Sequence, residues 1–220
     1  MASIKTIFLS LVAAASLTNA AAVPTQDGQV TVETRTLSAR AAPQWYSGTW
    51  DRFPGKSTWK SFDDLFNRND DMMKYAGSTQ NDINRIKTGI NAAASQYKID
   101  NRVLLAMIMQ ESHGYVGVRT TYSWEGIPTA GIMQCSGCPG FPGLTNLSQA
   151  QITSMILAGA KHFRGNLDRN GGDGYQPKSV YPALREYNSG NVNHADLSDG
   201  RGATPSYVSD VVQRLGGWFD

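Results

Sequence analysis

The sequence predicts a mainly helical domain that is built around one buried helix. Residues 103–113 read V-L-L-A-M-I-M-Q-E-S-H, and they are apolar on every side rather than along one stripe, in a run too short to cross a membrane. Apolar residues recur at helical spacing on both sides of this segment. Residues 114–147 lose this periodicity and are rich in glycine, proline and aromatic residues, which predicts an irregular or short-β region of the kind that is often functional.

Further helices follow from the apolar spacing and from capping signals. They are expected over residues 59–67, 82–98, 148–163, 180–187 and 204–215. Asp100 is the expected N-cap of the buried helix. Ser148 and Gln151 match a capping box, and Thr204 followed by Pro205 predicts the start of the last helix.

The N-terminal region predicts the compartment. Residues 1–22 resemble a secretory signal peptide, because one cation (Lys5) precedes an apolar core far shorter than the roughly 20 residues of a membrane span, and Ala20 and Ala22 suit cleavage. Residues 23–42 are polar and lack helical or strand periodicity, which predicts a propeptide or flexible lead. We therefore expect a secreted, extracellular protein whose single folded domain spans residues 43–220.

Two features of the middle region fit a secreted chain. Cys135 and Cys138 are the only cysteines, in C-S-G-C, and a disulfide is the default expectation outside the cell. A thioredoxin-like redox pair is the alternative, but no βαβ pattern accompanies the motif. Asn146 heads an N-L-S sequon, which marks a surface glycosylation site if the source modifies its secreted proteins.

Composition argues against several classes of function. The formal net charge of +2, without a basic stripe, argues against a nucleic-acid partner. The two cysteines and three scattered histidines form no zinc-binding pattern, so no zinc site is expected. No G-x-S-x-G motif of a serine hydrolase occurs. We expect a monomer that does not bind a membrane.

Glu111 is the main candidate for a catalytic residue. It stands in the last turn expected for the buried helix, where burial disfavours its charge and the helix carbonyl groups repel it. Both effects raise the pKa of a carboxyl group and keep it protonated near neutral pH, as a general acid for glycoside cleavage requires. The alternative is a glutamate that leaves the helix and points into solvent.

Four motifs carry a resemblance to a known family. They are E-S-H at 111–113, G-I-M-Q at 131–134, E-Y-N-S-G at 186–190 and Y-V-S-D-V-V at 207–212. Their order and approximate spacing resemble those of goose-type lysozymes and soluble lytic transglycosylases. The resemblance implies an α+β lysozyme-like fold in which the irregular region forms one wall of a glycan groove. It also implies cleavage of the β-1,4 bond between N-acetylmuramic acid and N-acetylglucosamine in peptidoglycan, without metal or cofactor.

The first two motifs imply roles for five residues. By resemblance Glu111 is the catalytic acid, and the Ser112 hydroxyl orients groups near it. Gly131 lets the backbone approach the sugar closely. Met133 and Gln134 belong to the substrate-groove motif, in which Gln134 could bind an N-acetyl group. For Met133 the alternative is an ordinary place in the core.

The third motif implies that Tyr187 and Asn188 belong to the site. In the family the tyrosine hydroxyl lies close to the catalytic carboxyl group, and the asparagine helps to line the sugar subsites. The alternative for Tyr187 is a core aromatic residue whose hydroxyl reaches the surface. Glu186 stands where the family usually has alanine, and we expect it to face solvent.

A second carboxylate would decide the chemistry. An inverting hydrolase needs a base about 6.5–9.5 Å from its acid, whereas a lytic transglycosylase uses the substrate's own 6-hydroxyl group. Goose-type lysozymes commonly carry two further acids near G-L-M-Q. Glu125 matches the first position, with an ordinary loop acid as the alternative, and Ser136 replaces the second. Hydrolysis or transglycosylation, a peptidoglycan or chitin-like substrate, and a non-catalytic glycan-binding protein of the same fold all stay open.

Overall fold

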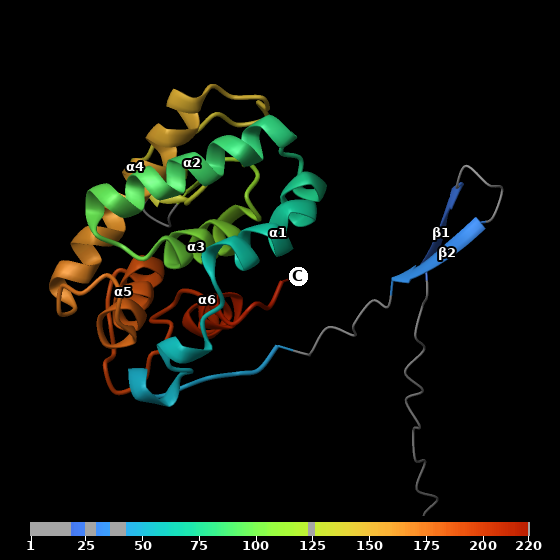
Figure 1. The fold of residues 1–220 in the computed structure, drawn as a ribbon. Helices are drawn as coiled ribbons and strands as arrows, with labels where there is room; N and C mark the ends of the chain where they lie inside the picture. Colours follow the sequence, from blue (N-terminus) through green and yellow to red (C-terminus); the bar gives the residue numbers. More distant parts are fainter. Residues whose placement is uncertain (1–18, 25–29, 36–42, 123–125, 220) are drawn as a thin grey trace, which may run out of the picture. The chain divides into compact units, whose positions relative to one another are not determined.

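The computed structural model describes residues 19–24, 30–35, 43–122 and 126–219, and the chain divides into two compact units, 1–42 and 43–220. In the first unit, β1 (Asn19–Pro24) pairs with β2 (Val30–Arg35) as an antiparallel hairpin (Figure 1). We expected no regular structure after residue 22, and β2 contradicts this. Its sequence V-T-V-E-T is rich in β-branched residues, which is a strand signal. The signal-peptide and propeptide assignments stay predictions.

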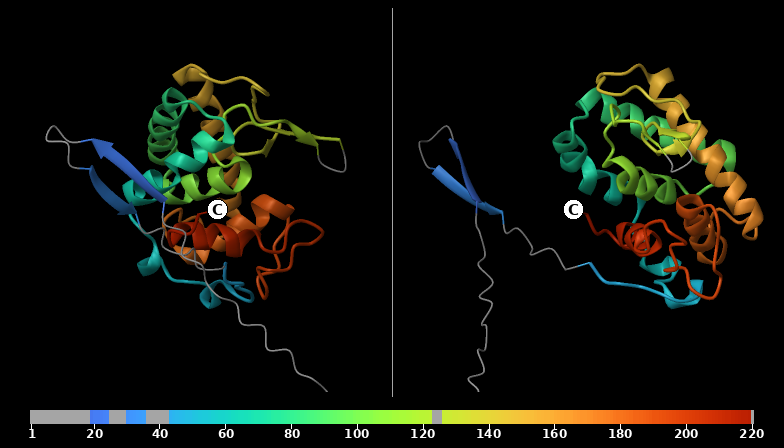
Figure 2. Two further views of the ribbon diagram at one scale, coloured as in Figure 1. Left: turned by 90° about the vertical axis from the view of Figure 1, so that its right-hand side faces the viewer. Right: turned by 180° about the vertical axis from the view of Figure 1, so that it is seen from behind.

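The second unit is mainly helical in its described residues, as predicted. Its helices are α1 (Phe62–Ala76), α2 (Gln80–Tyr97), α3 (Asn101–Ser112), α4 (Gln149–Arg169), α5 (Pro177–Ser189) and α6 (Tyr207–Leu215), preceded by two short 3-10 turns, Trp50–Arg52 and Lys56–Thr58. Three short strands, β3 (Thr121–Tyr122), β4 (Pro128–Ala130) and β5 (Cys135–Ser136), form an antiparallel sheet in that order. The sheet lies at one side of the helical unit, next to α4 (Figure 2).

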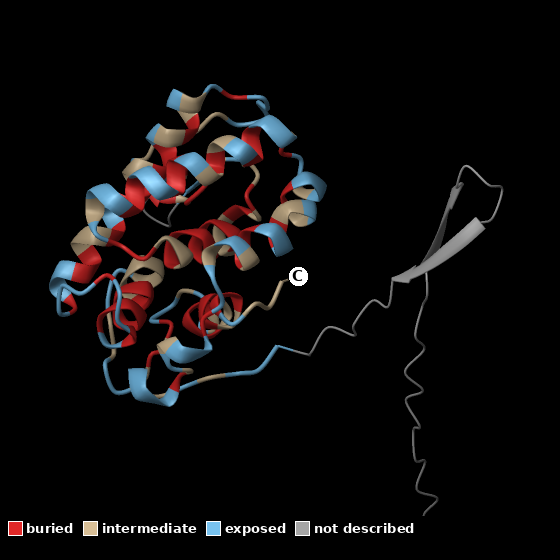
Figure 3. Cartoon of the chain, viewed as in Figure 1, coloured by how far each residue is buried: buried red, intermediate tan, exposed pale blue. Residues whose placement is uncertain are grey.

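Helix α3 is the buried centre of this unit, as its composition predicted. Helices α1 and α2 pack against it on one side and α6 on the other (Figure 1). All residues from Val103 to Met109 are buried (Figure 3), because the apolar side chains find a neighbour in every direction. The polar residues of α3 are confined to its two ends, and Glu111 lies in its last turn.

Two predicted helix starts are confirmed. The Asp100 side chain accepts a hydrogen bond from the backbone N–H of Arg102 at 3.1 Å, so it caps α3. Ser148 and Gln151 form the expected reciprocal capping box at α4.

Two other predicted helix starts are wrong. Helix α1 begins at Phe62, not Trp59, because Ser61 is its N-cap and Trp59 instead packs inward and donates to the Tyr181 hydroxyl at 3.0 Å. Helix α6 begins at Tyr207 rather than at residue 204, because the preceding turn is held by hydrogen bonds to another helix, as described below. No helix in the described part of the chain is long and apolar enough to span a membrane.

Candidate active site

Glu111 lies half-buried in the last turn of α3 and is bonded to a tyrosine from α6. The hydroxyl group of Tyr207, which is itself buried, donates a hydrogen bond to Oε1 of Glu111 at 2.5 Å. The packing of α6 against α3 brings the two side chains together. The carboxyl group is therefore held in one place by an element far from it in the sequence.

The surroundings of Glu111 change its acidity. Burial raises the pKa of Glu111 to about 7, although the hydrogen bond from Tyr207 lowers it in part. Burial also raises the pKa of Tyr207 well above its ordinary value, so the phenol keeps its proton and stays a donor. At neutral pH the protonated and ionised forms of Glu111 are both populated, which suits a group that gives up a proton and later recovers it.

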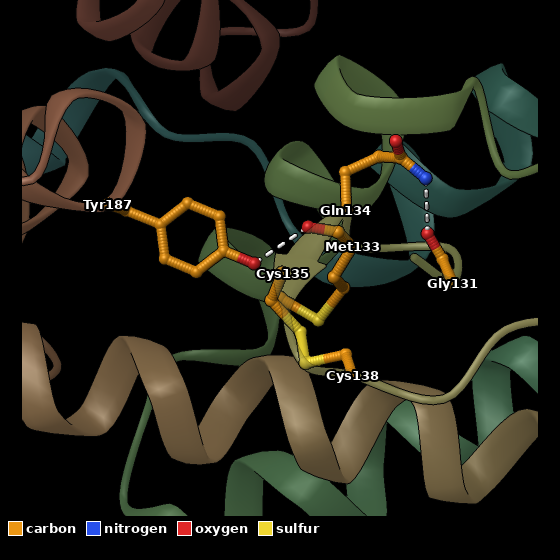
Figure 4. Close-up of a disulfide and its surroundings, with 6 residues drawn as sticks. All are labelled: Gly131, Met133, Gln134, Cys135, Cys138 and Tyr187. Carbon is orange, nitrogen blue, oxygen red and sulfur yellow. Dashed lines mark hydrogen bonds between the residues drawn. A yellow bond between two sulfur atoms is a disulfide. The ribbon is translucent and has the colours of Figure 1, made fainter. Parts of the chain in front are cut away.

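Tyr187 approaches the same region from α5. Its hydroxyl group donates to the carbonyl oxygen of Met133 at 2.7 Å (Figure 4), and its ring packs edge-on against His162 of α4 with the centroids 5.3 Å apart. Burial first, and then the charge of Glu111, raise the pKa of Tyr187 well above its ordinary value. Tyr187 thus lies within electrostatic reach of Glu111, but the direct hydrogen-bond partner of the acid is Tyr207.

Ser112 connects the end of α3 to the turn between β4 and β5. Its buried hydroxyl group lies 2.8 Å from the carbonyl oxygen of Ile132 and 3.1 Å from that of Ile108. The residue after Glu111 therefore fixes the position of the G-I-M-Q segment relative to the acid.

Residues 131–134 form a tight turn that Gln134 closes. The backbone N–H and the side-chain amide nitrogen of Gln134 both donate to the Gly131 carbonyl at 2.9 Å (Figure 4), and the amide nitrogen also donates to Arg119 at 3.3 Å. Gly131 has a φ of +74°, and a side chain there would run into the Pro139 carbonyl. We expected Gly131 and Gln134 to contact a sugar. The contacts that the structure describes for them instead shape the loop.

Met133 belongs to the core rather than to a groove wall. Its side chain is fully buried and packs against α4 where Gly159 leaves room for it, since a Cβ atom at Gly159 would lie 2.5 Å from the methionine sulfur. Only the backbone carbonyl of Met133 faces Tyr187. The core alternative for this residue is therefore the one that the structure supports.

The neighbours of Tyr187 on α5 differ from expectation. Asn188 Oδ1 accepts hydrogen bonds from the Arg185 guanidinium and from the backbone N–H of Thr204 at 3.1 Å, so it fastens the turn before α6. We expected Glu186 to face solvent, but it does not. Only 12% of its side chain is exposed, because its carboxylate accepts from Arg169 and Asn170, each at 2.5 Å.

A groove runs beside Tyr187 along α4. One hollow of about 320 Å³ is lined by Tyr187, Thr129, His162, Arg169 and Glu186, among others. A second, of about 470 Å³, shares Ser136, His162 and Arg169 with it and continues past the cysteine loop. Volumes of this size are typical of small-ligand sites. Burial, followed by the charge of Arg169, lowers the pKa of His162, so this ring is mainly neutral at neutral pH.

The predicted disulfide is confirmed. Cys135 of β5 and Cys138 are bonded, with their Cα atoms 5.4 Å apart (Figure 4). The bridge follows directly on the turn that Gln134 closes, and Ser136 and Cys138 line the groove. It therefore stiffens the loop between the G-I-M-Q segment and α4.

The remaining predictions concern Glu125, the sequon at Asn146 and metal binding. Glu125 lies outside the described residues. Asn146 is exposed just before α4, and its side-chain oxygen accepts a hydrogen bond from Arg85 at 3.0 Å. No group of three or more histidine, cysteine, aspartate or glutamate side chains in the described residues could hold a metal ion.

The structure also reveals two residues to which sequence reasoning gave no role. Tyr207 appeared only as the first letter of Y-V-S-D-V-V, and its place in that motif was the available signal. Arg185 gave no signal, because an arginine next to a glutamate in a helix is usually exposed. No protein-family model and no curated protein matches the chain.

Proposed function

We propose that this chain is a secreted glycan-cleaving enzyme with a lysozyme-like fold, and that Glu111 is its general acid. The proposed bond is the β-1,4 linkage between N-acetylmuramic acid and N-acetylglucosamine in peptidoglycan. One observation carries the proposal. The half-buried carboxyl group of Glu111 has a pKa of about 7 and accepts a hydrogen bond from the Tyr207 hydroxyl group at 2.5 Å. Both residues belong to motifs whose order resembles that of goose-type lysozymes and lytic transglycosylases.

The first chemical step uses the proton of Glu111. The carboxylic acid donates it to the glycosidic oxygen while the bond from that oxygen to the anomeric carbon breaks, so the leaving sugar departs as an alcohol and the remaining sugar takes up positive charge. The carboxylate that forms is stabilised by the hydrogen bond from Tyr207. Attack by water completes hydrolysis, whereas attack by the substrate's own 6-hydroxyl group completes transglycosylation.

The groove beside Tyr187 is the proposed binding site for the polymer. It adjoins the tyrosine that lies within electrostatic reach of Glu111, and α4 forms one long wall for an extended chain. Within this proposal Gln134, Ser112 and Met133 shape the loop under the sugar. Asn188 holds the turn that presents Tyr207.

Glu125 remains the proposed base if the reaction is hydrolysis. Glu186 is unsuited to that role, because both of its carboxylate oxygens already accept hydrogen bonds from Arg169 and Asn170. Mass spectrometry of the products distinguishes the two reactions. A terminal sugar lighter by one water indicates the 1,6-anhydro product of a transglycosylase and removes the role of Glu125, whereas an ordinary reducing end indicates hydrolysis.

Clearing of a bacterial cell-wall suspension tests the proposal. Wild type should clear the suspension and Glu111→Gln should not, since glutamine keeps the shape of the side chain but has no acidic proton. Asp71→Asn is the matched control, because this carboxylate on α1 is fully exposed. Equal clearing by wild type and Glu111→Gln would refute the assignment of the acid. Binding of walls without clearing by wild type would favour a non-catalytic glycan-binding protein.

A further inference from the structure

The hollow that continues past the cysteine loop, which we call the α4 hollow, is lined by two cations and, among the described residues, by no carboxylate. Its lining includes Ser136 of the cysteine loop and Ala158, Lys161, His162, Gly165 and Arg169 of α4. The α4 residues recur at intervals of three or four positions, so they share one face of the helix. This hollow of about 470 Å³ therefore carries positive charge that its own lining does not balance.

Arg169 is fixed in place but keeps one nitrogen open to a ligand. Its Nε atom donates to Glu186 at 2.5 Å, and the Asn166 side-chain oxygen, in the amide orientation that satisfies both of its ends, accepts from Nη2 at 3.0 Å. The Nη1 atom has no hydrogen-bond partner among the described residues, and 61% of the side chain is exposed. Two contacts thus orient the guanidinium group, while Nη1 can still donate to a bound group.

The open Nη1 atom of Arg169 lies over a glycine. A Cβ atom at Gly165 would lie 3.7 Å from Nη1, and among the described residues this is its nearest contact outside the adjacent residues and the helix backbone. Gly165 therefore leaves space on the floor of the α4 hollow. Lys161 stands one helical turn before Gly165 and Arg169 one turn after it, so the two cations flank this space. Lys161 is exposed and has no ion-pair partner among the described residues.

The acids closest to this face of α4 are already paired. Glu186 lines the neighbouring hollow, and its ion pair with Arg169 leaves only 12% of its side chain exposed. Asp168 is paired with Arg164 at 2.8 Å. Neither acid lines the α4 hollow, so the charge of Lys161 and the Nη1 atom of Arg169 are available to an anionic ligand.

We propose that the α4 hollow binds a carboxylate group of the substrate between Arg169 and Lys161, and that it thereby selects a glycan that carries carboxylates over a neutral one. Guanidinium and ammonium groups form the strongest hydrogen bonds to carboxylates. The α4 hollow shares Ser136, His162 and Arg169 with the hollow beside Tyr187, so one polymer can occupy both. The inference rests on the proposed function and deepens it by naming the substrate class.

Peptidoglycan offers carboxylates from two sources, and a chitin-like polymer offers none. The lactyl group of N-acetylmuramic acid ends in a carboxylate where it is free, and the peptides attached to other lactyl groups carry carboxylates of their own. Isothermal titration calorimetry on full-length Glu111→Gln, which should not cleave its ligands, can compare three tetrasaccharides. The first is the neutral N-acetylglucosamine tetramer, the second alternates N-acetylmuramic acid and N-acetylglucosamine with free lactyl groups, and the third carries peptides on those groups.

The ratio of anionic to neutral affinity measures the selection. We expect an anionic tetrasaccharide to bind more tightly than the neutral tetramer at low salt, and this preference should shrink as salt screens the charges. The anionic ligand that binds more tightly identifies the lactyl group or the peptide as the source of the carboxylate. Equal affinity for all three ligands at low salt would overturn the inference.

Two substitutions at one position separate charge from shape. Gly165→Asp places a carboxylate beside Nη1 of Arg169, whereas Gly165→Asn places a neutral side chain of the same shape there. The preference for the anionic ligand should be about tenfold smaller in Gly165→Asp than in Gly165→Asn, because the introduced charge repels the ligand and occupies its partner. Equal preferences in the two variants would contradict a carboxylate site at this place.

An exposed position keeps the test decisive if Gly165→Asp does not fold. Lys161→Gln removes one of the two cations, and the preference for the anionic ligand should fall about threefold. Lys178→Gln is the matched control, since this exposed lysine of α5 lines neither hollow, and it should keep the preference of its parent. A full preference in Lys161→Gln would contradict the role of Lys161.

The inference and the proposed function can fail separately. If wild type cleaves peptidoglycan but the anionic preference is absent, the carboxylate site is refuted and the enzyme assignment stands. If the preference and its loss in the variants are found but wild type cleaves no glycan, the proposed function is refuted and the carboxylate site stands.

Discussion

The hydroxyl group of Tyr207 lies 2.5 Å from Oε1 of Glu111, although the two residues are 96 positions apart in the sequence. Both side chains come from helix positions that face the interface of α3 and α6. Burial raises the pKa of Glu111 to about 7, and this contact both orients the carboxyl group and lowers the pKa in part, because the hydrogen bond stabilises the ionised form.

Removal of the Tyr207 hydroxyl group should change how activity depends on pH. The hydrogen bond lowers the pKa of Glu111, so Tyr207→Phe should raise that pKa. Because the general acid works only when protonated, the alkaline limb of the rate profile should move to higher pH, while the maximal kcat falls about tenfold. Rates of glycan release between pH 5 and pH 9 measure both effects. Tyr75→Phe is the control, because Tyr75 is exposed, and its rate profile should match that of wild type. If the alkaline limb of Tyr207→Phe lay at the same pH as that of wild type, the role of the contact would be contradicted.

The buried acid should cost stability at alkaline pH. The pKa of Glu111 is raised from 4.5 to about 7, so between these values the folded protein keeps a proton that the unfolded chain has lost. Stability should therefore fall as the pH rises through this window. Glu111→Gln cannot ionise, and we expect it to be about 3 kcal/mol more stable than wild type at pH 8 but nearly equal at pH 4. Urea unfolding at the two pH values checks this, and a difference independent of pH would contradict it.

Ser112 should contribute to both stability and activity. Ser112→Ala leaves the carbonyl oxygen of Ile132 without its 2.8 Å hydrogen bond, which should destabilise the fold by about 1 kcal/mol. The G-I-M-Q segment then moves relative to Glu111, so kcat should fall by more than the loss of folded protein explains. Ser154→Ala is the control, since this exposed hydroxyl group bonds only within α4. Full activity in Ser112→Ala would limit Ser112 to an ordinary helix-end residue.

Two glycines on α4 should respond in opposite ways to the same substitution. A Cβ atom at Gly159 would lie 2.5 Å from the sulfur of Met133, whereas at Gly165 the nearest atom, on Arg169, is 3.7 Å away. Gly159→Ala should therefore destabilise by about 1–3 kcal/mol through overpacking. Gly165→Ala should stabilise slightly, since alanine favours a helix. Thermal unfolding compares the pair, and a neutral Gly159→Ala would contradict the described packing of Met133.

Much of the helical architecture could be predicted from local signals. The central helix follows from a segment that is apolar on every side, and Asp100 and Ser148 mark helix starts because their side chains satisfy nearby backbone N–H groups. The disulfide follows from two cysteines in one short motif of a chain expected to be secreted. Each of these features depends on residues close together in the sequence.

The features that could not be predicted depend on distant contacts. Arg185 is buried because carbonyl groups of the turn before α6 surround it, and the same contacts place the start of α6 later than Thr204. Glu186 turns inward because Arg169 of another helix meets it. The Tyr207 contact requires α3 and α6 to be packed together. No local pattern contains this information.

The pH dependence of kcat/KM on purified peptidoglycan, measured for wild type and Glu111→Gln, tests the central claim most directly. We predict that wild type releases soluble fragments and loses half of its maximal kcat/KM near pH 7 on the alkaline side, as the acid gives up its proton. Glu111→Gln should release essentially none at any pH. Release of fragments by Glu111→Gln at the wild-type rate would contradict the account.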